Sequence, residues 1–111
     1  MLISLPRAEI QLVDWNIIQL SLPTGEYGEF FIGYSLHDML ARFSTPIVEY
    51  DNVKKVGKTK SGSTYMVIGE PGHPCKDGLH VLYQLFGKER IKKELFSSEA
   101  SGILSFKYPI K

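Results

Sequence analysis

The chain has 111 residues and a formal net charge of +1, with 43% hydrophobic and 23% charged residues. This length is typical of one domain, and the composition excludes an intrinsically disordered chain because enough apolar side chains are present for a packed core. The balanced charge argues against a dedicated nucleic-acid-binding domain, which is usually strongly basic. We therefore expect one globular domain over residues 1–111.

The expected cellular location follows from two further features. The single cysteine, Cys75, cannot form an intramolecular disulfide, which fits a reducing compartment. The first residues lack the basic start and apolar block of a signal peptide, and no window approaches the roughly 18 apolar residues of a membrane helix. We expect a cytoplasmic protein that does not contact a membrane.

The first predicted elements are strands. Residues 9–22 alternate apolar and polar side chains with the period of two of a half-buried strand. This alternation changes phase at Asp14, Trp15 and Asn16, which indicates either a bulge in one long strand or a turn between two short strands. Aromatic and β-branched residues predict another strand at residues 29–34.

A helix is predicted next, over residues 35–43. Ser35 is a suitable N-cap, and Asp38 places a carboxylate in the first turn. Apolar residues occur at helical spacing through this segment, namely Leu36, Met39, Leu40 and Phe43. Pro46 requires the helix to end before it, because proline disfavours helical backbone in the residue that precedes it.

A β-hairpin is the clearest local signal in the chain. A short strand at residues 47–50 ends at a turn that begins with Asp51, and a second strand is predicted at residues 53–60. One face of this second strand carries Lys54, Lys58 and Lys60. A turn containing Gly62 leads to a return strand at residues 65–68, which is apolar on both faces and is therefore expected in the centre of the sheet.

The last third of the chain is predicted to contain a loop, a helix and a strand. Proline and glycine indicate a loop at residues 70–78, and apolar spacing predicts a helix at residues 79–86 that stops at Gly87. Residues 88–96 fit a helix or a strand, with an acid–base pair four residues apart favouring the helix. Residues 102–110 alternate as a final strand.

These elements together predict an α+β fold. We expect a mainly antiparallel sheet of five to seven strands with one or two helices packed on one face.

Charge is distributed unevenly along the sequence. Residues 1–51 contain seven acidic and two basic residues, a net charge of −5, whereas residues 52–111 contain eleven basic and five acidic residues, a net charge of +6. The two halves either interleave in one sheet, so that the charges mix on the surface, or leave faces of opposite sign that steer a partner. We expect the first arrangement.

Two alternatives involve chemistry at residues 73–80. A thiol near an imidazole, Cys75 with His73, is one route to a nucleophile, and His73, Cys75, Asp77 and His80 carry metal-ligand atoms. Side chains two residues apart in an extended segment are about 6–7 Å apart, however, and the repeated short spacings of a structural zinc site are missing. We expect no catalytic residue, no metal and no cofactor.

A nucleic-acid-binding accessory role is a further alternative. The lysine-rich hairpin at residues 53–69 and the basic segment at residues 88–93 could contact phosphates, and Tyr50 and Tyr65 could stack on bases. Lysines are also a common protection of exposed sheet edges against aggregation. We expect this second role for them.

Part of the sequence resembles a pattern in small uncharacterised bacterial and phage proteins. The pattern consists of RFSTPI at residues 42–47, Asp51, TKSGSTY at residues 59–65 and GEPG at residues 69–72. It covers about residues 32–72 and consists of turn and strand residues. The resemblance implies no activity, so no functional residue is transferred from it.

The function that these observations favour is protein binding without catalysis. We expect an immunity or inhibitor-type protein of bacterial or phage origin that blocks a toxin, a nuclease or a component of a defence system. The sequence leaves open whether two copies pair through exposed apolar strands. The expected partner-binding residues are Glu49, Asp51, Lys54, Lys58, Lys60 and Tyr65.

Overall fold

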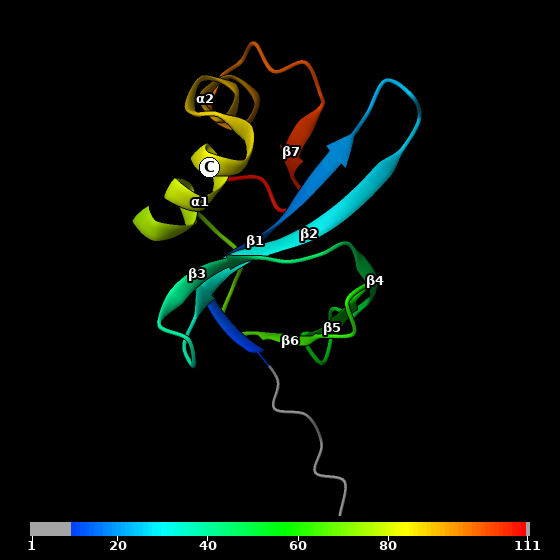
Figure 1. Cartoon of the computed structure of the whole chain (residues 1–111), viewed down its shortest axis with the longest axis vertical. Coiled ribbons are helices and arrows are strands. Elements are labelled where there is room, and N and C mark those ends of the chain that lie inside the picture. The colour runs from blue at the N-terminus through cyan, green and yellow to red at the C-terminus, as the bar shows by residue number, and fades with distance from the viewer. Residues whose placement is uncertain (1–9, 111) are drawn as a thin grey trace, which may run out of the picture.

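A computed structural model describes residues 10–110 of the chain (Figure 1). Seven strands and two helices follow one another along this part of the chain: β1 (Ile10–Ser21), β2 (Tyr27–Ser35), β3 (Leu40–Phe43), β4 (Ile47–Asp51), β5 (Val56–Thr59), β6 (Thr64–Val67), α1 (Lys76–Phe86), α2 (Lys88–Phe96) and β7 (Leu104–Phe106). Neither helix is long and apolar enough to cross a membrane.

The strands form one curled sheet with the order β3-β2-β1-β6-β5-β4, and β7 pairs separately with β1. All pairs are antiparallel except β1–β6. One edge of β1 has two partners, since residues 10–12 pair with β6 and residues 18–20 pair with β7. The predicted α+β class with a mainly antiparallel sheet is confirmed, and β6 lies inside the sheet as predicted.

A bulge divides β1 between these two partners. The register with β2 shifts between Val13 and Asn16, and Asp14 has a positive φ of 48°. The first of the two interpretations of the sequence, a bulge in one long strand, is therefore correct. The bulge increases the local bend of the strand, which lets the two halves of β1 pair with strands that do not pair with each other.

The side chain of Asn16 is fully buried at this bulge and joins three segments. Its Nδ2 donates to the carbonyl oxygens of Gly72 (3.0 Å) and Tyr108 (2.9 Å), and its Oδ1 accepts from the N–H groups of Ile17 (2.7 Å) and Tyr108 (3.3 Å). The neighbouring indole of Trp15 donates to the carbonyl of Gly69 (3.0 Å). Both side chains thus fix the loop after β6, and Asn16 also fixes the segment after β7.

Apolar side chains cover both faces of β1 and β2. One cluster contains Leu12, Trp15, Ile17, Phe31, Tyr65 and Val67, and Ile47 and Tyr50 of β4 pack against it. The other cluster lies beneath the helices and contains Ile18, Ile32, Leu82, Ile91, Leu104 and Phe106. Figure 1 shows α1 and α2 on one side of β1 and β2 and the β4–β6 strands on the other.

Gly57 in β5 is required by the packing of the first cluster. A β-carbon at this position would lie 2.7 Å from Cζ of Phe31, whose ring is fully buried. Carbon atoms in favourable contact are about 3.5–4.0 Å apart. The missing side chain therefore lets the Phe31 ring pack directly beneath the β5 backbone.

The predicted helix at residues 35–43 is wrong. Ser35 and Asp38 do form the interactions of a helix start, because the N–H of Asp38 donates to Ser35 Oγ and the N–H of Met39 donates to the Ser35 carbonyl. This single turn ends at Met39, where φ is 56°, and the chain returns as β3 beside β2. The helical spacing of the apolar residues does not indicate a helix here, because the spacing continues into strand β3. Leu36, Met39 and Leu40 are exposed and do not pack as the apolar face of a helix would.

Other predictions differ mainly at element ends. Residues 53–55 belong to the β4–β5 turn and not to a strand, because the Asp51 carboxylate accepts the N–H groups of Val53 and Lys54. Residues 88–96 form a helix, the final strand shortens to three residues, and α1 begins at Lys76, inside the predicted loop, and stops before Gly87. The predictions at residues 1–9 lie outside the described residues.

Replacing Asn16 by alanine is expected to destabilise the protein by about 3 to 5 kcal/mol. The substitution leaves several buried backbone groups without hydrogen-bond partners, and each such group costs about 1–3 kcal/mol. Urea unfolding measures the change, with Gln11→Ala on the exposed face of the same strand as the control. Equal stability of the two variants would contradict the role of Asn16.

Replacing Gly57 by alanine is expected to cost about 1–3 kcal/mol, because an added methyl group overpacks the core against Phe31. Gly72→Ala is the matched control, since a β-carbon there meets no atom within 4 Å and the backbone needs no positive φ. Thermal unfolding should show a lower midpoint for Gly57→Ala than for Gly72→Ala. The reverse order would refute the packing argument.

Candidate binding surface on the β4–β5 hairpin

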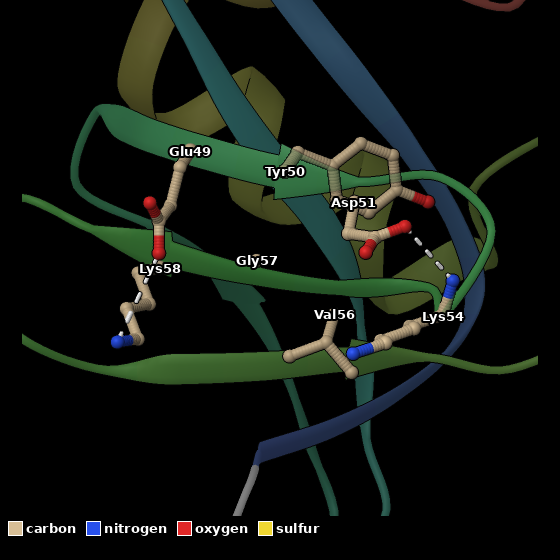
Figure 2. A pocket seen from close by; sticks show the side chains of 7 residues that line it. All are labelled: Glu49, Tyr50, Asp51, Lys54, Val56, Gly57 and Lys58. Carbon is tan, nitrogen blue, oxygen red and sulfur yellow. Dashed lines mark hydrogen bonds and ion pairs between the residues drawn. The ribbon is translucent and has the colours of Figure 1, made fainter.

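The outer face of the β4–β5 hairpin carries a shallow pocket of about 350 Å³ (Figure 2). Its carboxylates belong to Glu49 and Asp51 of β4, and its ammonium groups belong to Lys54 of the connecting turn and Lys58 of β5. The remaining lining comes from Tyr50, Val56 and Gly57. Figure 2 shows Glu49 and Asp51 along one strand, with Lys58 and Lys54 near the two ends of the other.

Strand alternation separates this polar face from the core. In β5, Gly57 and Thr59 are buried whereas Lys58 is exposed. In β4, the Tyr50 ring faces inward, 5.6 Å from the ring centre of Phe31, and its two neighbours in sequence are exposed. Since successive side chains point to opposite faces of a strand, the charged residues gather on the outer face.

The charges in the pocket interact only weakly with one another. Lys58 Nζ lies 3.8 Å from Glu49 Oε1, and the two side chains are 62% and 69% exposed. An exposed pair of this kind contributes about 0–1 kcal/mol or nothing measurable, because water and salt screen it. Both groups therefore remain available to charges on another molecule.

Two of the residues that line the pocket have shifted pKa values. The backbone N–H groups of Lys54 and Val53 donate to the Asp51 carboxylate and lower its pKa. Burial raises the pKa of the Tyr50 phenol to about 12, with further contributions from Tyr108 and Asp51. Asp51 is therefore charged and Tyr50 neutral at physiological pH.

The structure brings together four of the six residues predicted to bind a partner. Glu49, Asp51, Lys54 and Lys58 line the pocket, whereas Lys60 lies exposed in the β5–β6 turn. Tyr65 is only 3% exposed and packs against Phe31, with ring centres 5.2 Å apart. Its side chain therefore belongs to the core and offers no surface to a partner.

The sequence does not identify Tyr50, Val56 and Gly57 as pocket residues, and it suggests Tyr50 only as a base-stacking residue. Their contribution depends on how β4 lies beside β5, with Tyr50 opposite Gly57 and Asp51 opposite Val56. The one signal in the sequence is the assignment of residues 47–50 and 53–60 to neighbouring strands, which does not define the register.

The two basic segments of the sequence lie on different parts of the molecule. Among the described elements, α2 contacts only α1 and β7, whereas the lysine hairpin lies on the other side of β1 and β2 (Figure 1). Charges of the acidic and basic halves pair at Glu49–Lys58 and at Glu29–Lys107, the latter at 3.1 Å. The halves interleave, and no joint basic surface forms from the hairpin and α2.

The residues considered for catalysis or metal binding do not converge. His73 Nδ1 lies 2.6 Å from the carbonyl oxygen of Pro74, and the imidazole stacks on Phe96. Cys75 is the N-cap of α1. It lines a shallow depression together with Asp14, Tyr34, Lys76 and Asp77. Within residues 10–110, no group of three His, Cys, Asp or Glu side chains is placed to hold a metal ion.

Comparisons with known proteins give no match: the chain matches no family model, no curated protein and no solved structure. The resemblance of residues 32–72 to small bacterial and phage proteins therefore stays a prediction. The site must be interpreted from its own geometry.

A second depression, of about 280 Å³, lies between α2 and the segment that leads into β7, and Arg90 and Lys93 are on its rim. Its buried carboxylate, Glu94, accepts hydrogen bonds from Ser101 Oγ (2.7 Å) and from the backbone N–H groups of Ser101 and Ile103. These bonds, led by the Ser101 hydroxyl, lower the pKa of Glu94 from 4.5 to about 2. Glu94 is occupied in holding this segment.

Glu94→Gln is expected to lower the stability at neutral pH. Because the folded-state pKa is below the unfolded value, the carboxylate stabilises the fold above about pH 4.5 and loses this effect as the pH falls toward 2. The stability difference between the wild type and Glu94→Gln should therefore shrink over this range in urea unfolding. Glu99→Gln, at an exposed site, is the control. A difference that is independent of pH would show that the anchoring bonds are not made by the charged carboxylate.

Proposed function

We propose that this chain is a non-catalytic protein-binding module of the immunity or inhibitor type. It acts by covering a surface of a protein partner with the outer face of the β4–β5 hairpin. The observation that carries the proposal is the pocket lined by the acidic Glu49 and Asp51 and the basic Lys54 and Lys58, in which Glu49 lies opposite Lys58.

The arrangement of charge in the pocket supports a protein partner. Acidic side chains on β4, beside basic side chains on β5 and on the connecting turn, match a surface that carries the same two signs in reverse order. Complementary charges of this kind speed association and discriminate against wrong partners. The weak Glu49–Lys58 pair can exchange its members for charges of the partner at little cost, because both side chains are already largely exposed.

The proposed partner is a toxin, a nuclease or a component of a defence system, in a bacterium or its phage. Steric occupation of a functional surface would inhibit such a partner without any catalytic group on the inhibitor. The seven residues that line the pocket are fewer than the roughly 20–30 residues that each partner contributes to a standard interface. Neighbouring exposed residues of the same hairpin, such as Val48 and Lys60, would extend the contact.

Charge reversal in the pocket tests the proposal. The wild type and the variants Glu49→Lys/Asp51→Lys and Lys54→Glu/Lys58→Glu serve as baits in lysate of the source organism, with captured proteins quantified by mass spectrometry. Association of the purified partner is then followed at several salt concentrations. We expect both variants to associate at least about tenfold more slowly at low salt, because steering contributes roughly 10-fold or more to such rates.

Matched reversals on and near α2 control for the change in net charge. Glu89→Lys/Glu99→Lys and Lys88→Glu/Lys92→Glu exchange the same charges at exposed positions far from the hairpin. They should associate like the wild type. The proposal fails if the partner binds both pocket variants as tightly and as quickly as the wild type.

A further inference from the structure

The two ends of the sheet are built differently. In the path of paired strands, β4 forms one end and β3 forms the other. An end strand presents unpaired backbone N–H and C=O groups that can template another strand, and proteins usually protect it with charges, proline or bulges.

The β4 end carries two of these protections. Its register with β5 shifts between Ile47 and Glu49, which interrupts the regular ladder at Val48. Glu49 and Asp51 add exposed acidic side chains. Pairing of this strand with a copy of itself would bring these like charges together.

The β3 end lacks the bulge and the proline, although α1 packs against this strand. Its register with β2 is regular from Leu40 to Phe43, and it contains no proline. Its one charge, Arg42, is paired within the chain with Asp38, Nε 2.6 Å from Oδ2, and its side chain remains 38% exposed. Within residues 10–110, no strand pairs with the outer edge of β3.

The orientation of the free backbone groups follows from the ladder. The N–H of Ser44 donates to the carbonyl of Phe31, and hydrogen-bonded pairs in an antiparallel ladder occur at every second residue. Arg42 and Leu40 therefore also point their N–H and C=O groups toward β2. Those of Ala41 and Phe43 point outward.

Apolar side chains extend this edge into the β2–β3 turn. Three apolar side chains that are close together in sequence are exposed: Leu36 by 46%, Met39 by 76% and Leu40 by 50%. Figure 1 shows this turn projecting from the β3 end of the sheet, on the side away from the helices. Exposed apolar side chains of this kind favour contact with another molecule when they form one patch.

We propose that β3 pairs with β3 of a second copy of this chain, antiparallel about a twofold axis at Ala41. This register uses the outward groups of Ala41 and sets Leu40 opposite Arg42 of the second copy. A twofold axis at Arg42 would instead place two guanidinium groups opposite each other, which is unfavourable. The occupant that fits is a short, partly apolar strand whose one charge is paired within its own chain, and β3 is itself such a strand.

The pairing leaves the β4–β5 pocket free, because that pocket lies at the other end of the sheet. The inference is therefore independent of the proposed function. The contact consists of one short strand and one turn, so the dimer should be weak and reversible, with a Kd on the order of 0.1 mM.

Sedimentation equilibrium of the full chain over a protein concentration range of about 10 μM to 1 mM, which brackets the Kd expected for so small a contact, tests the proposal. The wild type should dimerise, and Leu40→Lys should abolish dimerisation because it places a lysine opposite Arg42 of the second copy. Ala41→Pro should do the same, because it removes an outward N–H without breaking a bond to β2. Val53→Lys, at an 86% exposed residue of the other hairpin, adds the same charge and should leave dimerisation unchanged.

Amide hydrogen exchange provides the second measurement. The N–H groups of Ala41 and Phe43 should exchange more slowly at high wild-type concentration, and those of Leu40 and Arg42 should not respond. The proposal is overturned if the wild type stays monomeric over the whole concentration range, or if Leu40→Lys dimerises as the wild type does. Since Leu40 is half exposed, Leu40→Lys remains informative even where Ala41→Pro does not fold.

Discussion

The hydrogen bonds of the Asn16 amide hold the architecture together. A bulge in a central strand breaks the regular ladder and leaves backbone groups to be satisfied in other ways. In this protein one buried side chain supplies two donors and one acceptor oxygen to Gly72, Tyr108 and Ile17. The bent β1 then offers one half to β6 and the other half to β7, and the two apolar clusters form on its opposite faces. Without the amide, the bend would bury unpaired polar groups between two cores.

The sequence predicted those parts of the fold that depend on local chemistry. Period-two alternation located β1, its change of phase located the bulge, and Gly87 marked the end of α1. The error at residues 35–43 has a physical origin, because a capped turn and an apolar stripe are also compatible with a tight hairpin. Pairing of residues 40–43 with β2 favours the hairpin over the helix. Such a tertiary contact cannot be predicted from the local spacing of apolar residues.

The candidate site was partly predictable for the same reason. Charged residues on two consecutive predicted strands suggested that Glu49, Asp51, Lys54 and Lys58 would be exposed, and they share one pocket. The prediction that Tyr65 binds a partner was wrong. Its strand carries apolar residues on both faces, and the sequence does not indicate which face lies in the core. Its burial beside Phe31 follows from the absence of a side chain at Gly57, which faces Tyr65 across the ladder.

The pairing of β1 with β7 joins the first and the last of the described strands. Ile18 pairs with Phe106, and the Asn16 amide reaches Tyr108, 92 residues away in the sequence. Contacts of such long sequence separation slow folding, because the intervening chain must first be closed into a loop. During synthesis, the second apolar cluster lacks Leu104 and Phe106 until residues 104–106 have been added. A nascent chain that ends before β7 consequently leaves one of its two cores open to water and to chaperones.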